Sequence, residues 1–281
     1  RVGNLSAREI GKLQPTYQAS TDNAENYGCG ILSDGRVVTT DIGNQASGEG
    51  NGQLIIWFPP FTKGFKVVKN GANGKVPYCK LDIGIATAGG IAVDADDNLY
   101  VASARPPTSG VWKYSGPFPT SARRSRGCDA KDTTGAPLAS DVRKEQLIAA
   151  GEHGLVSPNA IVAVPGSDHW YVSSVFTGVI NEYDASGAFV RTILEPPPGE
   201  GPGPEPISTG SPLGLGVAPD GTLFFADIGL VISDLGVGPG DNTGSVRRIR
   251  FVGGEPQPPE TMAEGLAFPD GIGIFVPPRR G

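Results

Sequence analysis

The stretch SPNAIVAVPGSDHWYVSSV, residues 157–175, contains two short apolar runs on either side of Pro-Gly-Ser. Apolar residues alternate with small or polar ones within each run, which is typical of β-strands. The glycine permits the backbone conformation that a tight connection between antiparallel strands requires. The stretch therefore predicts a β-hairpin.

The same pattern recurs along the chain, and each complete copy ends its second run in Asp or Ser. The other copies are YGCGILSDGRVVTTD from Tyr27, GGIAVDADDNLYVAS from Gly89, LGLGVAPDGTLFFAD from Leu213 and the shorter DGIGIF from Asp270. Third strands are predicted from Gly52, Gly110, Gly178 and Gly244, and weaker fourth strands at residues 65–69, 145–149 and 189–194. Four strands in each repeated unit are typical of a β-propeller, whose sheets bury their faces against one another.

We therefore predict an all-β chain folded as a single β-propeller domain over residues 1–281, with blades of four antiparallel strands. The repeats indicate five blades, and six are the alternative. The last unit begins too near the end of the sequence to complete a blade. We expect it to take strands from residues 1–20, which would close the ring by joining N- and C-terminal strands. A β-sandwich competes with this interpretation, but a hairpin repeated in constant register favours the propeller.

The chain carries a net charge of −6 over 281 residues, and its acidic residues are spread along the sequence. This charge argues against nucleic acid or an anionic membrane as the main partner, because both bind basic surfaces. No apolar run reaches the ~20 residues of a membrane-spanning helix. Abundant Gly, Pro and Thr with few Lys lead us to expect a mature exported domain, secreted or periplasmic.

Three cysteines allow one disulfide and leave one thiol over. Cys79 and Cys128 both lie in long segments without a regular strand pattern, so they are the candidates for a bridge. The sequence does not assign either cysteine to a face of the propeller. Cys29 lies inside a first strand beside the channel. We expect it to be a buried packing residue, and the alternative is that its neighbours Gly28 and Gly30 leave it exposed.

Candidate site residues come from one end of the predicted blades. The start of a first strand and the end of a second strand lie at the same end of an antiparallel sheet. That end gathers the leading residues Tyr27, Gly89, Asn159, Leu213 and Asp270, and the second-strand ends Asp41, Ser103, Ser174 and Asp227. Asn159, Asp270, Asp41 and Asp227 offer oxygen ligands that suit calcium or magnesium. Alternatively, the Asp side chains make Asx-type turns that hold the following loops.

The sequence contains two histidines. His153 lies six residues before Asn159, in the loop that enters the same blade, so we consider it as a general base. His169 follows the hairpin turn at the opposite end, and we expect it to be structural. The connections at residues 41–52 and 227–244 are long, which is typical of binding surfaces, although their glycines also fit a flexible cover.

The recurring phrase, most complete in SPNAIVAVPGSDHWYVSSVFTGVINEYDASG, resembles that of the gluconolactonase and regucalcin-like propellers and the related NHL-repeat proteins. In the lactonase members a divalent cation lies at the channel mouth, held by a Glu, two Asn and an Asp at the starts of first strands. Asn159 matches a family Asn, and Asp270 matches the family Asp. Tyr27 stands at the position of the Glu, and Gly89 and Leu213 stand at the remaining equivalent positions.

The resemblance implies a hydrolase of lactone or ester type that acts on a small molecule at the channel mouth. In this hypothesis a divalent cation, calcium by preference, polarises the carbonyl while His153 or Asp270 activates water. The alternative is a non-enzymatic propeller of NHL type that binds a protein, peptide or glycan on its loop-rich face. A third, weaker hypothesis is a lyase that uses a histidine.

Overall fold

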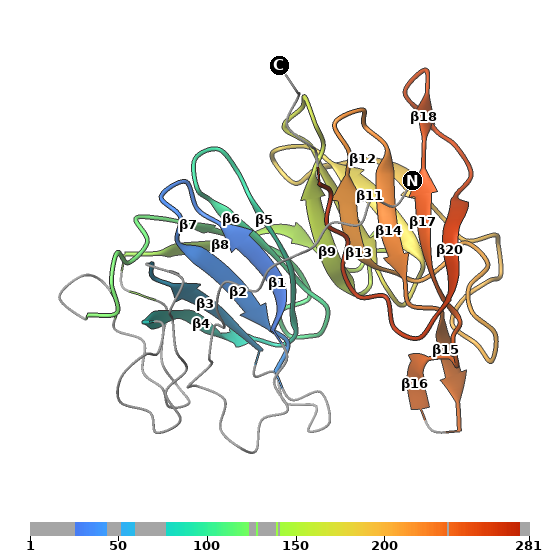
Figure 1. Ribbon diagram of the computed structural model, residues 1–281, viewed down its shortest axis with the longest axis horizontal. Coiled ribbons are helices and arrows are strands. Elements are labelled where there is room, and N and C mark those ends of the chain that lie inside the picture. The colour runs from blue at the N-terminus through green and yellow to red at the C-terminus, as the bar shows by residue number, and fades with distance from the viewer. Residues whose placement is uncertain are drawn as a thin grey trace.

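The computed structural model describes residues 26–43, 52–59, 77–123, 128, 139, 141–234 and 236–275. These residues form an all-β structure with four sheets of four antiparallel strands, arranged as the blades of a propeller (Figure 1). None of them forms a helix that could span a membrane.

Each blade uses its strands in chain order from the inside outward. The first blade comprises β1 (Asn26–Ile31), β2 (Val37–Asp41), β3 (Gly52–Trp57) and β4 (Tyr78–Ile85). The second comprises β5 (Ala88–Val93), β6 (Leu99–Ser103), β7 (Gly110–Ser115) and β8 (Arg143–Ala149). The third comprises β9 (Pro158–Ala163), β10 (Trp170–Ser174), β11 (Val179–Tyr183) and β12 (Phe189–Leu194).

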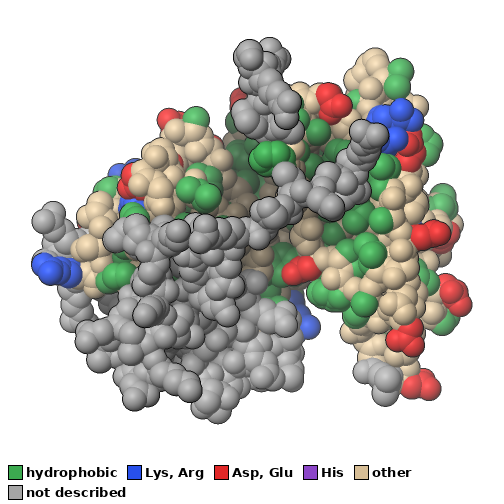
Figure 2. Space-filling model, in the orientation of Figure 1, with side chains coloured by type: hydrophobic (Ala, Val, Ile, Leu, Met, Phe, Trp, Pro, Cys, Tyr) green, Lys and Arg blue, Asp and Glu red, His purple; other side chains and the backbone are tan. Residues whose placement is uncertain are grey.

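The fourth blade comprises β13 (Pro212–Val217), β14 (Leu223–Asp227), β17 (Gly244–Ile249) and β20 (Glu260–Leu266). Two small hairpins interrupt it: β15 (Leu230–Ser233) with β16 (Gly236–Pro239), and β18 (Phe251–Val252) with β19 (Glu255–Pro256). In the view of Figure 2, apolar side chains gather on the half of the molecule that contains this blade, and acidic side chains lie along its outer edge.

The strand register brings the start of each first strand opposite the end of the second. In the first and second blades Asn26 pairs with Asp41 and Ala88 with Ser103. The third and fourth blades repeat this arrangement, with the pairs Pro158–Ser174 and Pro212–Asp227. The residues expected at the channel mouth therefore do lie at one end of their sheets.

Glycines in the inner strands let neighbouring blades approach closely. A Cβ atom on Gly30 of β1 would lie only 2.6 Å from a methyl carbon of Val93 in β5. A Cβ on Gly214 of β13 would lie 2.5 Å from the backbone oxygen of Asp270. Residues 270–274 therefore pack beside β13 where the first strand of a fifth unit would lie, although they form no ladder of their own.

The hydrophobic core lies between successive blades. Leu54, Tyr114 and their neighbours fill the space between the first and second blades. Val172 contributes to the cluster between the second and third blades, and Phe225 to that between the third and fourth. A propeller requires a core between each pair of neighbouring blades, because each sheet carries apolar side chains on both of its faces.

The structure confirms the predicted first, second and third strands of four blades and the fourth strands β8 and β12. It corrects the fourth strand of the first blade, which is β4 at residues 78–85, while residues 65–69 lie outside the described part of the chain. The connection at 227–244 is not a plain flexible cover, because it folds into the β15–β16 hairpin. The expected ring closure by residues 1–20 also lies outside the described residues.

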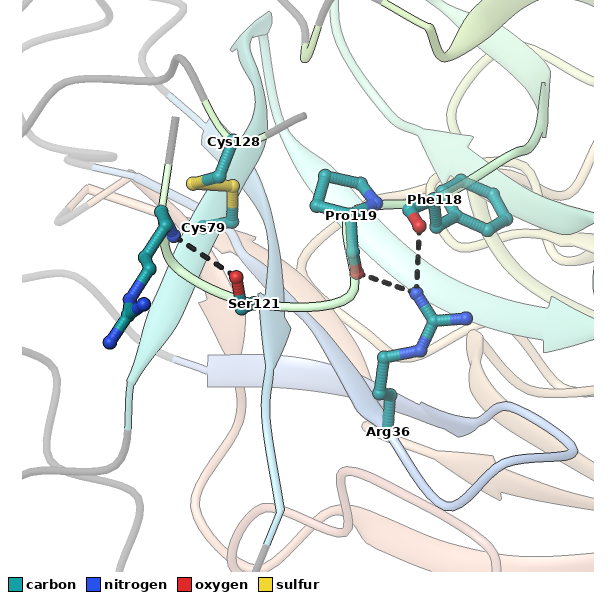
Figure 3. Close-up of a disulfide and its surroundings, with 7 residues drawn as sticks. Arg36, Cys79, Phe118, Pro119, Ser121 and Cys128 are labelled. Atoms are coloured by element: carbon teal, nitrogen blue, oxygen red, sulfur yellow. Dashed lines mark hydrogen bonds between the residues drawn. A yellow bond between two sulfur atoms is a disulfide. The ribbon is translucent and has the colours of Figure 1, made fainter. Parts of the chain in front are cut away.

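Cys79 and Cys128 form the expected disulfide, with Cα atoms 5.8 Å apart (Figure 3). Cys79 belongs to β4, so the bridge ties an outer strand to the long connection after β7. Arg36 holds the same connection by donating hydrogen bonds to the backbone oxygens of Phe118 (3.0 Å) and Pro119 (2.6 Å). The expectation that Cys29 is buried is wrong, because its side chain is exposed.

Candidate functional site at the channel mouth

The mouth of the channel contains a cavity of about 170 Å³. Its walls come from the starts of inner strands, from residues just after second strands and from the segment that follows β20. The lining residues are Tyr27, Ile42, Thr87, Ala104, Arg105, Asn159, Val175, Phe176, Leu213, Ile228, Leu230, Phe268 and Asp270. Two of the four predicted metal ligands, Asn159 and Asp270, are thus brought to one cavity.

Three polar side chains of the cavity lining meet in one cluster. The amide of Asn159 donates hydrogen bonds through Nδ2 to the hydroxyl of Tyr27 (2.6 Å) and to the backbone oxygen of Leu213 (3.0 Å). The Tyr27 hydroxyl lies 3.3 Å from the same Leu213 oxygen and also hydrogen-bonds the carboxylate of Asp270. Asn159 is only 6% exposed, whereas Asp270 is exposed.

The electrostatics of this cluster keep Tyr27 neutral. Burial raises the pKa of the phenol well above its ordinary value of 10.0, and the negative charge of Asp270 raises it further, against a smaller lowering by Asn159. A phenol with a raised pKa keeps its proton at neutral pH. Tyr27 can therefore act as a hydrogen-bond donor in this cavity.

The walls of the cavity are apolar. Val175, Leu213, Ile228 and Leu230 are buried in one cluster, and Phe176 packs against it. Val175 and Ile228 follow immediately after the second strands β10 and β14. The same position holds Ile42 in the first blade and Ala104 in the second. These walls were not predicted from the sequence, although the apolar residue after each strand-ending Asp or Ser is a usable signal.

Asp227 holds loops together and does not line the cavity. Its Oδ1 accepts hydrogen bonds from the backbone N–H groups of Ser211 (2.7 Å) and Gly229 (2.9 Å). Its Oδ2 accepts one from the hydroxyl of Ser245 (2.9 Å) and pairs with Arg247 at 3.0 Å. This arrangement corresponds to the Asx-type alternative for Asp227.

Asp41 has the equivalent position in the first blade. It is fully buried, and its Oδ1 accepts a hydrogen bond from the backbone N–H of Gly43 at 2.8 Å, as an Asx turn requires. Asp41 does not line the cavity either. The structure therefore brings Asn159 and Asp270 together and leaves Asp41 and Asp227 behind the cavity wall.

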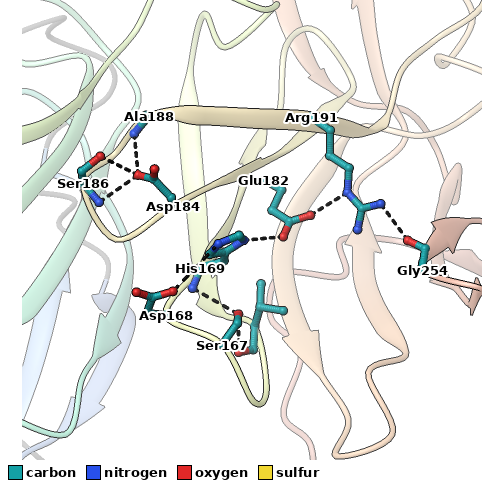
Figure 4. A network of polar contacts seen from close by, with 10 residues as sticks. Ser167, Asp168, His169, Glu182, Asp184, Ser186, Ala188, Arg191 and Gly254 are labelled. Atoms are coloured by element: carbon teal, nitrogen blue, oxygen red, sulfur yellow. Dashed lines mark hydrogen bonds and ion pairs between the residues drawn. The ribbon is translucent and has the colours of Figure 1, made fainter.

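His153 lies apart from the cavity lining. Its ring stacks on that of Phe189 in the outer strand β12, with centroids 3.7 Å apart, and its backbone oxygen accepts a hydrogen bond from Asn181. His169 lies at the opposite end of the blade, as expected, and its Nδ1 is 2.7 Å from Glu182 (Figure 4).

The donors around the cavity do not fit a resident calcium ion as they are arranged. Calcium takes six to eight oxygen ligands, several of them carboxylates. Asp270 is the one carboxylate among the described lining residues, and Asn159 turns its NH₂ group, not its oxygen, toward Leu213. The described residues contain no group of three or more His, Cys, Asp and Glu side chains that could hold a metal.

A second cavity of about 150 Å³ shares Tyr27 and Asp270 with the first. Its lining includes Cys29 and glycine-rich stretches of the inner strands. Gly28 and Gly30 face β5, so the side chain between them points the other way, toward this cavity. This geometry explains why Cys29 is exposed.

No protein-family model and no curated protein match the sequence. Among solved structures, a luciferin-regenerating enzyme is 15% identical, with a TM-score of 0.50 over 88% of this chain and 65% of its own. A nidogen/laminin complex is 14% identical (TM-score 0.46, 79% and 63% covered). Regucalcin from Agrobacterium tumefaciens strain C58, titled a calcium-binding protein, is 15% identical (TM-score 0.45, 75% and 54% covered).

The chain thus spans less than two thirds of the length of each of these structures. At these identities the likeness concerns the fold. The match to the luciferin-regenerating enzyme supports the β-propeller fold alone.

Proposed function

We propose that this protein is a hydrolase of lactone or ester type that acts at the channel mouth, with Asp270 as its general base. One observation carries the proposal: an exposed carboxylate lines a cavity beside a neutral phenol that a buried amide holds in position. A base and hydrogen-bond donors in one water-accessible cavity are the elements that ester hydrolysis needs.

In the proposed reaction Asp270 accepts a proton from water as the water oxygen bonds to the carbonyl carbon of the substrate. The carbonyl oxygen takes the negative charge. The tetrahedral intermediate then collapses, the bond to the leaving oxygen breaks, and Asp270 returns the proton to that oxygen. The products are a carboxylic acid and an alcohol, which are one molecule when the substrate is a lactone.

Tyr27 and Asn159 supply donors for the developing negative charge. The hydroxyl of Tyr27 and the NH₂ group of Asn159 are 2.6 Å apart, so both can approach one carbonyl oxygen. The hydrogens of Asn159 Nδ2 and of the Tyr27 hydroxyl already have acceptors in the cluster, so each donor would exchange its bond to Leu213 or Asp270 for one to the oxyanion. A donor to the oxyanion is worth about 100-fold in rate or more. His153 receives no role, because its ring stacks on Phe189.

The reaction is assigned no metal-dependent step, because the donor set at the cavity does not fit a divalent cation. A bound cation would polarise the carbonyl. Calcium held by Asn159, Asp270, Asp41 and Asp227 stays a prediction that metal analysis of the purified protein tests. A stoichiometric ion in the active protein would take over the oxyanion role that we propose for Tyr27.

Two variants test the proposal. Asp270→Asn removes the base and keeps the shape of the side chain, so turnover of a panel of lactones and esters should fall at least about 100-fold. Asp220→Asn is the matched control, because Asp220 is exposed in a hairpin turn and only bonds Thr222 nearby. Equal turnover by wild type and Asp270→Asn would contradict the proposal, and so would a wild type that cleaves nothing on the panel.

The alternative function is docking of a protein, peptide or glycan on the same face. It is supported by the β15–β16 hairpin, which presents Ile232 (43% exposed) and Val237 (53% exposed) next to Leu230 of the cavity. An Ile232→Ser, Val237→Ser double variant should leave hydrolysis unchanged if the cavity is an active site. Loss of hydrolysis in that variant would favour an extended binding surface.

The ring is proposed to contain a fifth blade whose first strand is residues 270–274. The proposal is supported by the close packing of this segment on Gly214 and Gly216 of β13. Export to an oxidising compartment is likewise proposed, because the Cys79–Cys128 disulfide persists mainly outside the reducing cytosol.

A further inference from the structure

The cavity walls are poorly suited to a polyhydroxylated substrate. Eight of the residues that line it have apolar side chains: Ile42, Ala104, Val175, Phe176, Leu213, Ile228, Leu230 and Phe268. Four of these are at least 94% buried and pack as one cluster. A sugar hydroxyl pressed against them would lose its hydrogen bonds to water, at a cost of about 1–3 kcal/mol for each hydroxyl left without a partner.

One of the residues that line the cavity, Thr87, nevertheless carries a hydroxyl group. Thr87 lines the cavity, is 7% exposed, and its Oγ1 has no hydrogen-bond partner among the described residues. Buried hydroxyls normally find a partner. The Oγ1 atom of Thr87 lies behind the cavity surface, so it would bond a single polar atom of a ligand after rotation of the side chain about its Cα–Cβ bond. Thr87 precedes Ala88 at the start of β5, and the next residue, Gly89, approaches Asn159 closely.

The size of the cavity limits the apolar part of a ligand. An engineered cavity of about 150 Å³ lined by Leu, Ile and Phe stays dry and binds benzene. The cavity at the channel mouth, at about 170 Å³, accommodates a ring of that size or a short alkyl chain. Arg105 at the rim is the one cationic residue among the described lining residues, and it complements a carboxylate product.

We propose that the substrate is a lactone or ester with an aryl or short alkyl acyl group and few hydroxyls, not a sugar lactone. The apolar group lies among the walls, the carbonyl faces Tyr27 and Asn159, and a second oxygen accepts a hydrogen bond from Thr87. This inference rests on the proposed hydrolase function for the reaction, but the ligand class is independent of turnover.

The kinetic test compares dihydrocoumarin, an aryl lactone, with glucono-δ-lactone. We expect kcat/KM to be at least about 100-fold higher for dihydrocoumarin, because two or more hydroxyls of the sugar lactone would be desolvated without partners. Comparable or higher kcat/KM for glucono-δ-lactone overturns the inference.

A binding test separates the ligand class from catalysis. 2-Tetralone has the shape of dihydrocoumarin but a ketone in place of the ester, so no hydrolase can cleave it. Calorimetry should detect its binding to wild type and a roughly tenfold weaker Kd for Phe268→Ser and for Thr87→Val. Phe275→Ser is the matched control, because Phe275 is exposed in the same segment (60%, against 51% for Phe268) but does not line the cavity.

The outcomes discriminate between the two proposals. Binding of 2-tetralone that Phe268→Ser and Thr87→Val weaken, in a protein without lactone turnover, supports the ligand class and refutes the hydrolase. Turnover of lactones with no binding of 2-tetralone, or with binding that Phe275→Ser weakens as much as Phe268→Ser, refutes the ligand class and leaves the hydrolase standing.

Discussion

The hydroxyl of Tyr27 connects residues from three other parts of the ring. It bonds Asn159 of β9, the backbone of Leu213 in β13 and the carboxylate of Asp270. A single residue at the start of β1 thus contacts Asn159 and Asp270, two of the residues that the sequence assigned to the site. At the position where the resembling lactonases have a metal-binding Glu, this chain has a neutral hydrogen-bond donor.

Tyr27→Phe should reduce kcat by about 100-fold, because one donor to the oxyanion is removed. KM should change little, since the ring that lines the cavity remains. Stability should fall by about 1 kcal/mol for the lost hydrogen bonds. Tyr100→Phe is the matched control: it removes a hydroxyl that bonds Asp94 at 2.9 Å, away from the cavity lining. If both variants keep full kcat, Tyr27 has no part in the reaction.

Glu182 links the third blade to the fourth through a network of polar contacts (Figure 4). It lies 2.7 Å from His169 and 2.7 Å from Arg191, whose guanidinium also donates to the backbone of Gly254 in the β18–β19 connection. Burial raises the pKa of Glu182, but the hydrogen bonds from His169 and Arg191 outweigh it, and the pKa lies below its ordinary value of 4.5.

The lowered pKa fixes the direction of a pH effect. A carboxylate whose pKa is lower in the folded state stabilises the fold above its unfolded pKa and loses that contribution as the pH falls through the folded value. Glu182→Gln should therefore be less stable than wild type at pH 7, and the difference should shrink below about pH 4.5. Urea unfolding from pH 3 to 7 measures this, with the exposed Glu264→Gln as control. A difference that does not vary with pH would contradict it.

At the residue scale, the sequence named Asn159 and Asp270, which line the cavity, together with Asp41, Asp227 and His153, which do not. It did not predict the apolar walls. Asn159 and Asp270 were identifiable because a repeat holds its scaffold constant while its leading residue varies. The apolar walls were not predicted, because Val175 and Ile228 are not distinguishable in the sequence from the many other apolar residues of the chain. Only the strand register, which puts second-strand ends beside first-strand starts, shows that they surround one cavity.

Among the elements, β4 was the strand that sequence reasoning placed wrongly. Its sequence YCKLDIGI contains a lysine and an aspartate that are both buried in the structure. These charged residues interrupt the apolar pattern by which a buried strand is recognised. Asp82 is tolerated there because it accepts hydrogen bonds from the Tyr114 hydroxyl (2.7 Å) and Lys144 (2.5 Å) of the second blade. Buried charges require such partners, and these partners lie more than 30 residues away in sequence.

The disulfide secures this same strand. It closes a loop between residues 49 positions apart, so its removal should lower the free energy of unfolding by about 4 kcal/mol. The double variant Cys79→Ser, Cys128→Ser tests this by urea unfolding, with Cys29→Ser as the control that leaves the bridge intact. Thiol titration of the denatured, unreduced wild type should find one free thiol, and three would exclude the bridge.

For the whole molecule, the propeller could be predicted because the sequence pattern of each hairpin is local and recurs along the chain. Each hairpin has its own turn, and the glycines of the first strands β1, β5 and β13 match the close approach of a neighbouring segment. What could not be predicted depends on contacts outside the repeat: the exposure of Cys29, the position of His153 on Phe189, and the pairing of β15 with β16.

The most direct test of the channel mouth as an active site is a crystal structure of the Asp270→Asn variant with dihydrocoumarin. The variant should bind the lactone without cleaving it. We expect the aromatic ring among Val175, Leu230 and Phe268, with the carbonyl oxygen within hydrogen-bonding distance of the Tyr27 hydroxyl or the Asn159 amide. A lactone bound elsewhere, or one whose carbonyl points away from these two donors, would contradict the assignment of the channel mouth as the active site.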